Sequence, residues 1–181
     1  MSSPIIEVNM KKRRSNRLLN FDYSASRSYF ITICTHKMNC IFGDIISEKM
    51  LLNECGEIAK KYWSDIPEHF HRIEMDEFII MPNHIHGIIN IIDDVGSRHS
   101  ELDFNKYQKI ISGSIGSIIR SYKSAVTKWV HQNTSTQNVW LRNYYEHIIQ
   151  NDKELDQIRE YIKFNPLNWQ IKKNEHLNKY W

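Results

Sequence analysis

Residues 73–92 read IEMDEFIIMPNHIHGIINII, and they contain two apolar runs on either side of a turn-forming pair. The first run extends from Ile73 to Met81, and the second from His84 to Ile92. Isoleucine and phenylalanine favour strands, whereas the Pro82-Asn83 pair favours a turn. We therefore predict an antiparallel β-hairpin over these residues.

The chain before the hairpin contains strand patterns and then a helix pattern. Residues 29–35 read YFITICT, and a short apolar stretch follows over 40–46, so paired strands are predicted here. Asn53 begins a helical pattern with acidic residues in its first turns, and Pro67 lies beyond its predicted end.

The chain after the hairpin is mainly helical. Residues 106–131 repeat isoleucine, tyrosine and valine at helical spacing, and residues 139–141 suggest one short strand. Asn151 followed by Glu154 resembles a capping box that opens a last helix, which we expect Pro166 to end. This element order predicts an α+β fold, an antiparallel sheet with helices packed mainly on one face.

The length of 181 residues suits one domain, because single domains commonly have about 100 to 200 residues. Residues 1–26 lack a sustained period and are predicted to form a basic N-terminal arm. The domain itself is expected over 27–169, followed by a C-terminal tail over 170–181.

The net charge of +3 is unevenly distributed along the chain. The first 20 residues contain five basic residues and a single acidic one, and residues 104–145 contain six basic residues and no acidic one. Such segments favour a polyanionic partner, either nucleic acid or acidic lipid.

The three cysteines, Cys34, Cys40 and Cys55, show no CxxC spacing, and the chain has no apolar leader. This pattern predicts a reduced, cytoplasmic protein. The apolar runs are also far shorter than the roughly 20 residues that a membrane-spanning helix needs.

Two histidines are candidates for metal ligands. His84 and His86 are two residues apart on a predicted strand, so both imidazoles project from one face and can reach one cation. The alternative is a pair of half-buried histidines without a ligand.

A second candidate pair lies on the last predicted helix. Tyr161 and Asn165 are four residues apart and share one helix face, which presents a phenol and an amide together. The alternative is a core tyrosine and a helix-ending asparagine, and Tyr144 and Tyr145 compete for any role of a tyrosine.

Four stretches of the chain resemble the REP-associated tyrosine transposases, a branch of the single-tyrosine HUH transposases. They are YFITICTH (29–36), MDEFIIMPNHIHGIINI (75–91), IIRSYKS (118–124) and NYYEHIIQNDKELDQIREYIKFNPLNW (143–169). The combination of MPNHIHG with a later YIxxNP is the most specific part. The resemblance implies a ferredoxin-like core, a metal held by His84, His86 and Asn165, and Tyr161 as the nucleophile.

This resemblance implies a metal-dependent reaction on single-stranded DNA. With Mg²⁺ or Mn²⁺ bound, Tyr161 would attack a phosphodiester to give a 5′-phosphotyrosine link and a free 3′-OH, which a later attack could rejoin. Two alternatives remain open, a DNA-hairpin-binding protein without catalytic activity and a metal phosphodiesterase that uses water as its nucleophile.

The expected partners are single-stranded DNA and DNA hairpins, bound by a monomer or a homodimer at the nucleoid. We expect the central basic helix to guide DNA beside the metal site and the arm to clamp a hairpin, unless these residues form only a solvated face. The predicted DNA-binding residues are Lys11, Lys12, Arg13, Arg14, Arg17, Arg120, Lys123 and Lys128.

Overall fold

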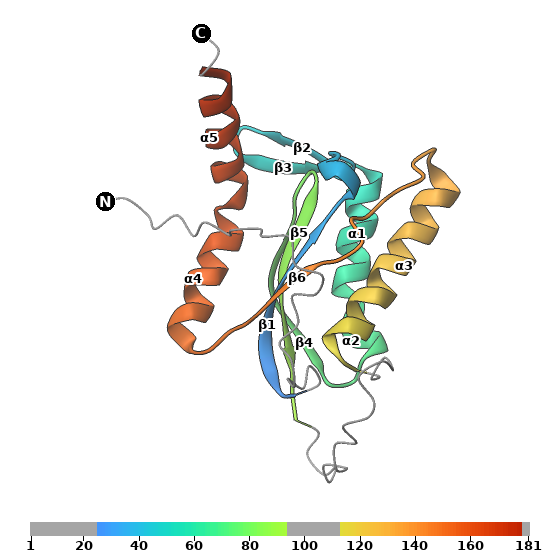
Figure 1. Cartoon of the computed structure of the whole chain (residues 1–181), viewed down its shortest axis with the longest axis vertical. Helices are drawn as coiled ribbons and strands as arrows, with labels where there is room; N and C mark the ends of the chain where they lie inside the picture. The colour runs from blue at the N-terminus through green and yellow to red at the C-terminus, as the bar shows by residue number, and fades with distance from the viewer. Residues whose placement is uncertain (1–24, 94–112, 179–181) are drawn as a thin grey trace.

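A four-stranded antiparallel sheet forms the centre of the molecule in the computed structural model, which describes residues 25–93 and 113–178 (Figure 1). Its strands follow the spatial order β4-β5-β1-β6. They are β1 Arg27–Cys34, β4 Ile73–Ile80, β5 His84–Ile91 and β6 Tyr145–Ile148. The other described elements are β2 Gly43–Ile46, β3 Lys49–Leu52, the 3₁₀ turn η1 His36–Met38, α1 Glu54–Ser64, α2 Ile66–His69, α3 Ile115–Asn133, α4 Asp152–Lys163 and α5 Asn165–Asn178.

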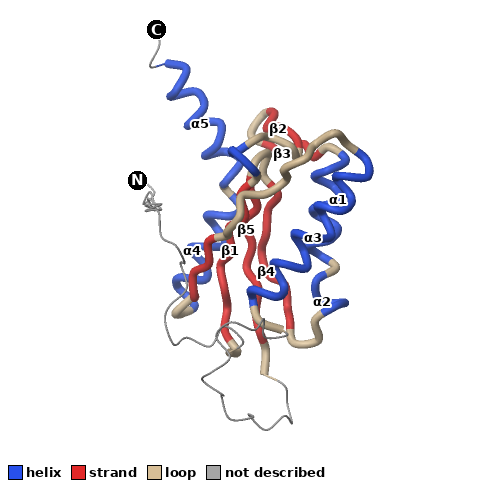
Figure 2. The backbone as a smooth tube through the Cα atoms, turned by 45° about the vertical axis from the view of Figure 1, so that its right-hand side comes forward, coloured by secondary structure: helices blue, strands red, loops and turns tan. Residues whose placement is uncertain are grey.

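Helices cover the two faces of this sheet unequally. Helices α1 and α3 pack together on one face, whereas α4 covers the other (Figures 1 and 2). The sheet and its helices have the topology of a ferredoxin-like fold. The chain order is β1, α1, β4, β5, α3 and β6, and the four strands lie in the order β4-β5-β1-β6. The predicted α+β fold is therefore confirmed, with most of the helical cover on one face.

The alternation of side chains along β5 produces two separate cores. Ile85, Ile89 and Ile91 join a cluster of 20 buried residues under α1 and α3, whereas Ile88 joins a cluster of five under α4. His84 and His86 follow the same alternation and face α4. The face that carries these histidines is thus covered mainly by α4 over a small apolar cluster, and α5 contacts His84 through Trp169.

Gly87 lets a large aromatic ring approach the sheet closely. A Cβ atom added at this position would lie 2.4 Å from Cζ2 of the fully buried Trp63 on α1. The glycine between His86 and Ile88 therefore serves packing on the α1 face, opposite the histidines.

Two predictions about strands are wrong. The strand predicted over 40–46 does not pair with β1, because β2 pairs with β3 through a tight turn in which Ser47 and Glu48 have positive φ. The stretch over 139–141 makes one isolated bridge, Thr35 to Trp140, and the fourth strand of the sheet is β6. The sequence signals for these two features are weak. The turn between β2 and β3 has no glycine at Ser47 and Glu48, and β6 has only four residues.

Two predicted helix ends also differ from the structure. Helix α3 begins at Ile115, where Ser114 accepts a hydrogen bond from the Ser117 amide, while residues 106–112 lie outside the described residues. Pro166 does not end the helical region, because it lies in the first turn of α5, where its missing N–H is not needed. Helix α5 crosses the suggested boundary at residue 169.

Candidate metal and nucleophile site

The two histidines of the HIH sequence lie side by side at the start of β5. Their ring centroids are 4.6 Å apart, and the residues are only 9% (His84) and 6% (His86) exposed. The strand direction thus brings both imidazoles to one place on the α4 face, as the spacing predicts.

Each imidazole is held through its Nδ1 atom. Asn83 Oδ1 lies 2.7 Å from Nδ1 of His84, and Thr32 Oγ1 lies 2.9 Å from Nδ1 of His86. Asn83 also donates from Nδ2 to the Met38 carbonyl at 3.1 Å, which fixes its Oδ1 toward the histidine. His84 must therefore donate from Nδ1, and its Nε2 carries the lone pair that a metal needs.

His86 is held in its neutral form. Burial lowers its pKa well below 6.5, and the nearby charge of His84 lowers that pKa further. A neutral imidazole can bind a cation without first losing a proton, which favours metal binding at neutral pH.

Tyr161 meets this histidine pair from α4, and the Asn165 side chain contacts Tyr161. Tyr161 Oη lies 3.3 Å from Nε2 of His86, and the two ring centroids are 5.2 Å apart. Burial raises the pKa of the Tyr161 phenol, while a hydrogen bond with the Asn165 side chain partly offsets that rise. The phenol is therefore protonated at neutral pH.

Local sequence explains why these two side chains reach the site. Asn151 caps α4 by accepting a hydrogen bond from the Glu154 amide, as its sequence pattern predicts, and Ile158 and Ile162 bury the same side of the helix. Asn165 begins α5 after a break at Phe164 and is only 7% exposed. Because α4 ends at Lys163 and α5 begins at Asn165, the Asn165 side chain is buried.

The basic residues of α3 do not lie beside the histidines, so their predicted placement is wrong. Helix α3 covers the opposite face of the sheet, and both Arg120 and Lys128 are exposed there. Lys123 donates to the Leu141 carbonyl at 2.7 Å, and burial lowers its pKa to about 8. The sequence period identified a helix but not the face of the sheet that it covers.

The basic residues predicted in the arm lie outside the described residues. These are Lys11, Lys12, Arg13, Arg14 and Arg17.

Of the two competing tyrosines, Tyr145 packs against the small cluster under α4 and Tyr144 against the larger cluster. Tyr145 is therefore a matched comparison for Tyr161.

Sequence reasoning missed three neighbours of the histidines. Thr32 lies opposite His86 in the β1–β5 register, so a correct strand pairing would have found it. The sequence pattern indicates only a turn at Asn83 and gives no sign of its contact with His84. Trp169 lies with its ring centroid 5.8 Å from that of His84, and nothing in the sequence pattern of α5 indicates this contact.

The donor set suits a cation that accepts nitrogen and amide oxygen. Within residues 25–93 and 113–178, no group of three or more His, Cys, Asp or Glu residues is arranged to hold a metal. The histidine pair therefore depends on an amide such as Asn165, on water or on substrate oxygens for further ligands.

The chain has a clear relative by sequence, although no model of a protein family matches it. An uncharacterized protein of Haemophilus influenzae is 46% identical over 162 residues, which cover 87% of this chain and 90% of that protein.

Among solved structures, a REP-associated tyrosine transposase bound to a REP hairpin resembles the chain with a TM-score of 0.57 at 15% identity, over 88% of this chain and 74% of that one. The chain therefore belongs to the family of the Haemophilus influenzae protein and has the fold of the REP-associated tyrosine transposase.

Proposed function

We propose that this protein is a transposase-like, metal-dependent transesterase that cleaves and rejoins single-stranded DNA near hairpin repeats. The observation that carries this proposal is the 3.3 Å approach of Tyr161 Oη to Nε2 of His86, with Asn165 hydrogen-bonded to the same tyrosine. A nucleophile beside a pair of imidazoles is the arrangement that tyrosine-based cleavage of a phosphodiester requires. The fold shared with a hairpin-bound transposase supports DNA as the substrate.

The residues present fit a divalent cation, Mg²⁺ or Mn²⁺. Because Asn83 holds Nδ1 of His84, Nε2 is the nitrogen of that ring that would bind a cation, and the Asn165 amide, which is hydrogen-bonded to Tyr161, would supply an oxygen ligand. When bound, such a cation would polarise the scissile phosphate and stabilise the charge that develops during attack.

Tyr161 would form a bond from its Oη to phosphorus while the bond from phosphorus to the 3′ oxygen breaks. The phenol loses its proton, and the leaving 3′ oxygen takes one up, which leaves a 5′-phosphotyrosine and a 3′-OH. Because the ester bond is conserved, a 3′-OH can reverse the step without ATP.

The proposed setting is the nucleoid in the cytoplasm, with single-stranded DNA and DNA hairpins as partners of a monomer or homodimer. Among the described residues, no helix is both long and apolar enough to cross a membrane. The arm is the part of the chain best suited to grip a hairpin, since Arg120 and Lys128 lie on the face opposite Tyr161.

Incubation of the protein with Mn²⁺ and a labelled hairpin oligonucleotide with a single-stranded flank tests this function. The proposal predicts a covalent protein–DNA adduct together with a shortened strand that ends in 3′-OH. Strand cleavage without any adduct would instead indicate water as the nucleophile, and hairpin binding without cleavage would indicate a binding protein that has lost its chemistry.

Replacement of the arm cluster Lys11, Lys12, Arg13 and Arg14 by alanine is expected to weaken hairpin binding and flatten its salt dependence. Each lost phosphate contact removes about 0.9 from the slope of log affinity against log salt on duplex DNA. The measurement is a fluorescence anisotropy titration between low and physiological salt. An unchanged slope in the arm variant would contradict a clamping role.

Asn83→Ala is expected to weaken Mn²⁺ binding to the histidine pair by about 10- to 100-fold, because the variant no longer fixes the His84 tautomer. Electron paramagnetic resonance titration of free Mn²⁺ measures this affinity without reference to DNA cleavage. Asn39→Ala serves as a control, since that exposed side chain directly follows Met38, whose carbonyl accepts the hydrogen bond from Asn83. Equal Mn²⁺ affinity in the Asn83 variant and the wild type would rule out this tautomer-fixing role.

A further inference from the structure

Helix α4, which carries Tyr161, crosses the sheet from one edge strand to the other. It follows β6 directly in the chain, and it contacts β4 at the opposite edge of the sheet. The apolar cluster beneath it has only five buried residues, so apolar packing supplies limited control over where the helix lies. Polar contacts at the edges therefore have a large part in fixing its position.

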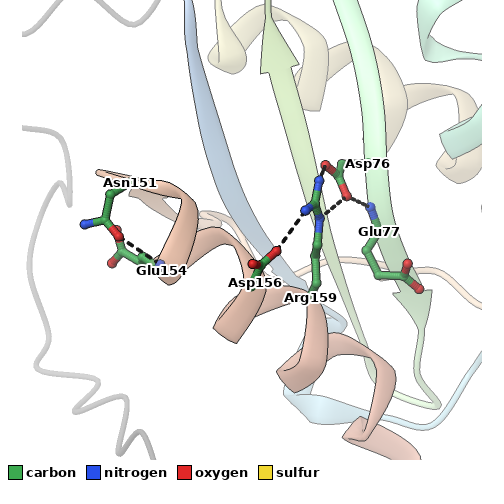
Figure 3. A network of polar contacts seen from close by, with 6 residues as sticks. All are labelled: Asp76, Glu77, Asn151, Glu154, Asp156 and Arg159. Atoms are coloured by element: carbon green, nitrogen blue, oxygen red, sulfur yellow. Dashed lines mark hydrogen bonds and ion pairs between the residues drawn. The ribbon is translucent and has the colours of Figure 1, made fainter.

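A bidentate ion pair joins α4 to β4, and its arginine lies two residues before Tyr161 in the chain (Figure 3). Arg159 donates from Nε to Asp76 Oδ1 at 3.0 Å and from Nη2 to Asp76 Oδ2 at 2.6 Å. The carboxylate side chain is 16% exposed and the guanidinium side chain 42%. Two parallel hydrogen bonds fix both the distance and the orientation of the helix, which a single contact cannot do.

Asp76 lies at a β-bulge in β4, on the face of the sheet that α4 covers. Met75 pairs with Ile89 and Phe78 pairs with Gly87, so two residues of β4, Asp76 and Glu77, oppose one residue of β5. The extra residue changes which side chains face α4, and the Glu77 amide donates to Asp76 Oδ1 at 2.6 Å. The hydrogen bond from the Arg159 guanidinium, and after it the one from the Glu77 amide, lower the pKa of Asp76, so the carboxylate is charged throughout the neutral range.

A second polar contact holds the beginning of the helix at the other edge. Glu154 Oε1 lies 2.7 Å from His147 Nε2 on β6, and Glu154 Oε2 accepts a hydrogen bond from the Gln150 amide. The helix is thus held at β6 near its start and at β4 two residues before Tyr161.

We infer that Arg159 and Asp76 are positioning residues for Tyr161, which hold α4 at the place and rotation that bring Oη to the histidine pair. This inference rests on the proposed function for its catalytic consequence. Loss of the pair would let α4 shift on its small apolar cluster, and misplacement of a nucleophile by about 1 Å can cost on the order of 100-fold in rate.

The test measures adduct formation in single turnover with the full chain, Mn²⁺ and the hairpin oligonucleotide. Arg159→Ala and Asp76→Asn are each expected to lower the rate constant at saturating DNA by about 10- to 100-fold. The half-saturating DNA concentration and the Mn²⁺ affinity should stay within about twofold of the wild type, since neither variant touches the histidines. The double variant should lose no more than either single variant, because both remove the same contact.

Asp156→Ala is the matched control. It removes the contact from Arg159 Nη1 to Asp156 Oδ1 at 3.0 Å within the helix but leaves the contact to β4 intact. Its rate should equal that of the wild type. Arg159→Lys keeps the charge and the fold but cannot make the bidentate contact, so it should retain only part of the rate.

Hydrogen exchange of the α4 amides provides a readout that does not depend on catalysis. Exchange over residues 158–162 should accelerate about tenfold or more in Arg159→Ala, while the amides of α1 stay unchanged. A full rate and unchanged exchange in both Arg159→Ala and Asp76→Asn would overturn the inference. If the wild type forms no adduct, the proposed function fails, and the exchange data alone then decide whether the ion pair holds α4.

Discussion

Tyr161→Phe is expected to abolish the covalent DNA adduct, with a loss of about 1000-fold or more, because the variant removes the only atom that forms the proposed bond to phosphorus. The ring that packs edge-on against Phe30 and His86 is retained. Stability should fall by no more than about 1 to 3 kcal/mol, since the hydroxyl makes a long hydrogen bond of 3.3 Å to His86 and one to the Asn165 side chain. A gel assay of labelled oligonucleotide and a thermal melt measure the two effects.

Tyr145→Phe is the control for this prediction. Tyr145 packs in the same small cluster under α4, and so the substitution tests whether loss of any hydroxyl near the site suffices. Its adduct should form at the rate of the wild type. Loss of adduct in Tyr145→Phe but not in Tyr161→Phe would reassign the nucleophile.

Removal of the cation or of its proposed ligands should have a similarly large effect. Excess chelator is expected to stop adduct formation, and added Mn²⁺ or Mg²⁺ should restore it, because the proposed attack depends on a polarised phosphate. His84→Ala and His86→Ala should each lower the rate by about 100-fold or more. Excess Mn²⁺ should not rescue a chain that lacks both imidazoles.

A cysteine on the same face provides the control for the histidine variants. Cys34 lies opposite His84 in the β1–β5 register, is half-buried and is not a proposed ligand. Cys34→Ala should therefore keep the wild-type response to Mn²⁺. Adduct formation that continues at full rate in chelator would exclude a metal-assisted mechanism.

The sequence predicts the core of this fold because its strongest signals are local. The alternation in His84 to Ile91 sets both faces of β5, and the Asn151 cap sets the start of α4. Pairing between strands that are distant in the chain has no comparable local signal. The sequence therefore does not reveal that β2 pairs with β3 instead of β1, or that β6 is the fourth strand of the sheet. The turn at Ser47 and Glu48 adopts positive φ without the glycine that usually announces it.

The histidines and the tyrosine could be singled out from the sequence, but the residues that orient them could not. Thr32 reaches His86 only through strand register, and Asp76 meets Arg159 only through the packing of α4 against β4. A hydrophobic period also cannot tell which face of the sheet a helix covers, so the sequence does not reveal that α3 lies on the face opposite the histidines and not beside the metal site.

The most direct test of the proposed chemistry is peptide mapping of the protein after reaction with Mn²⁺ and the hairpin oligonucleotide. Digestion with protease and nuclease, followed by mass spectrometry, identifies any residue that carries a nucleotide. The predicted result is a single modified peptide with a 5′-linked nucleotide on Tyr161 and an equal amount of product strand ending in 3′-OH. A cleaved strand with no modified peptide, or a nucleotide on Tyr144 or Tyr145, would contradict it.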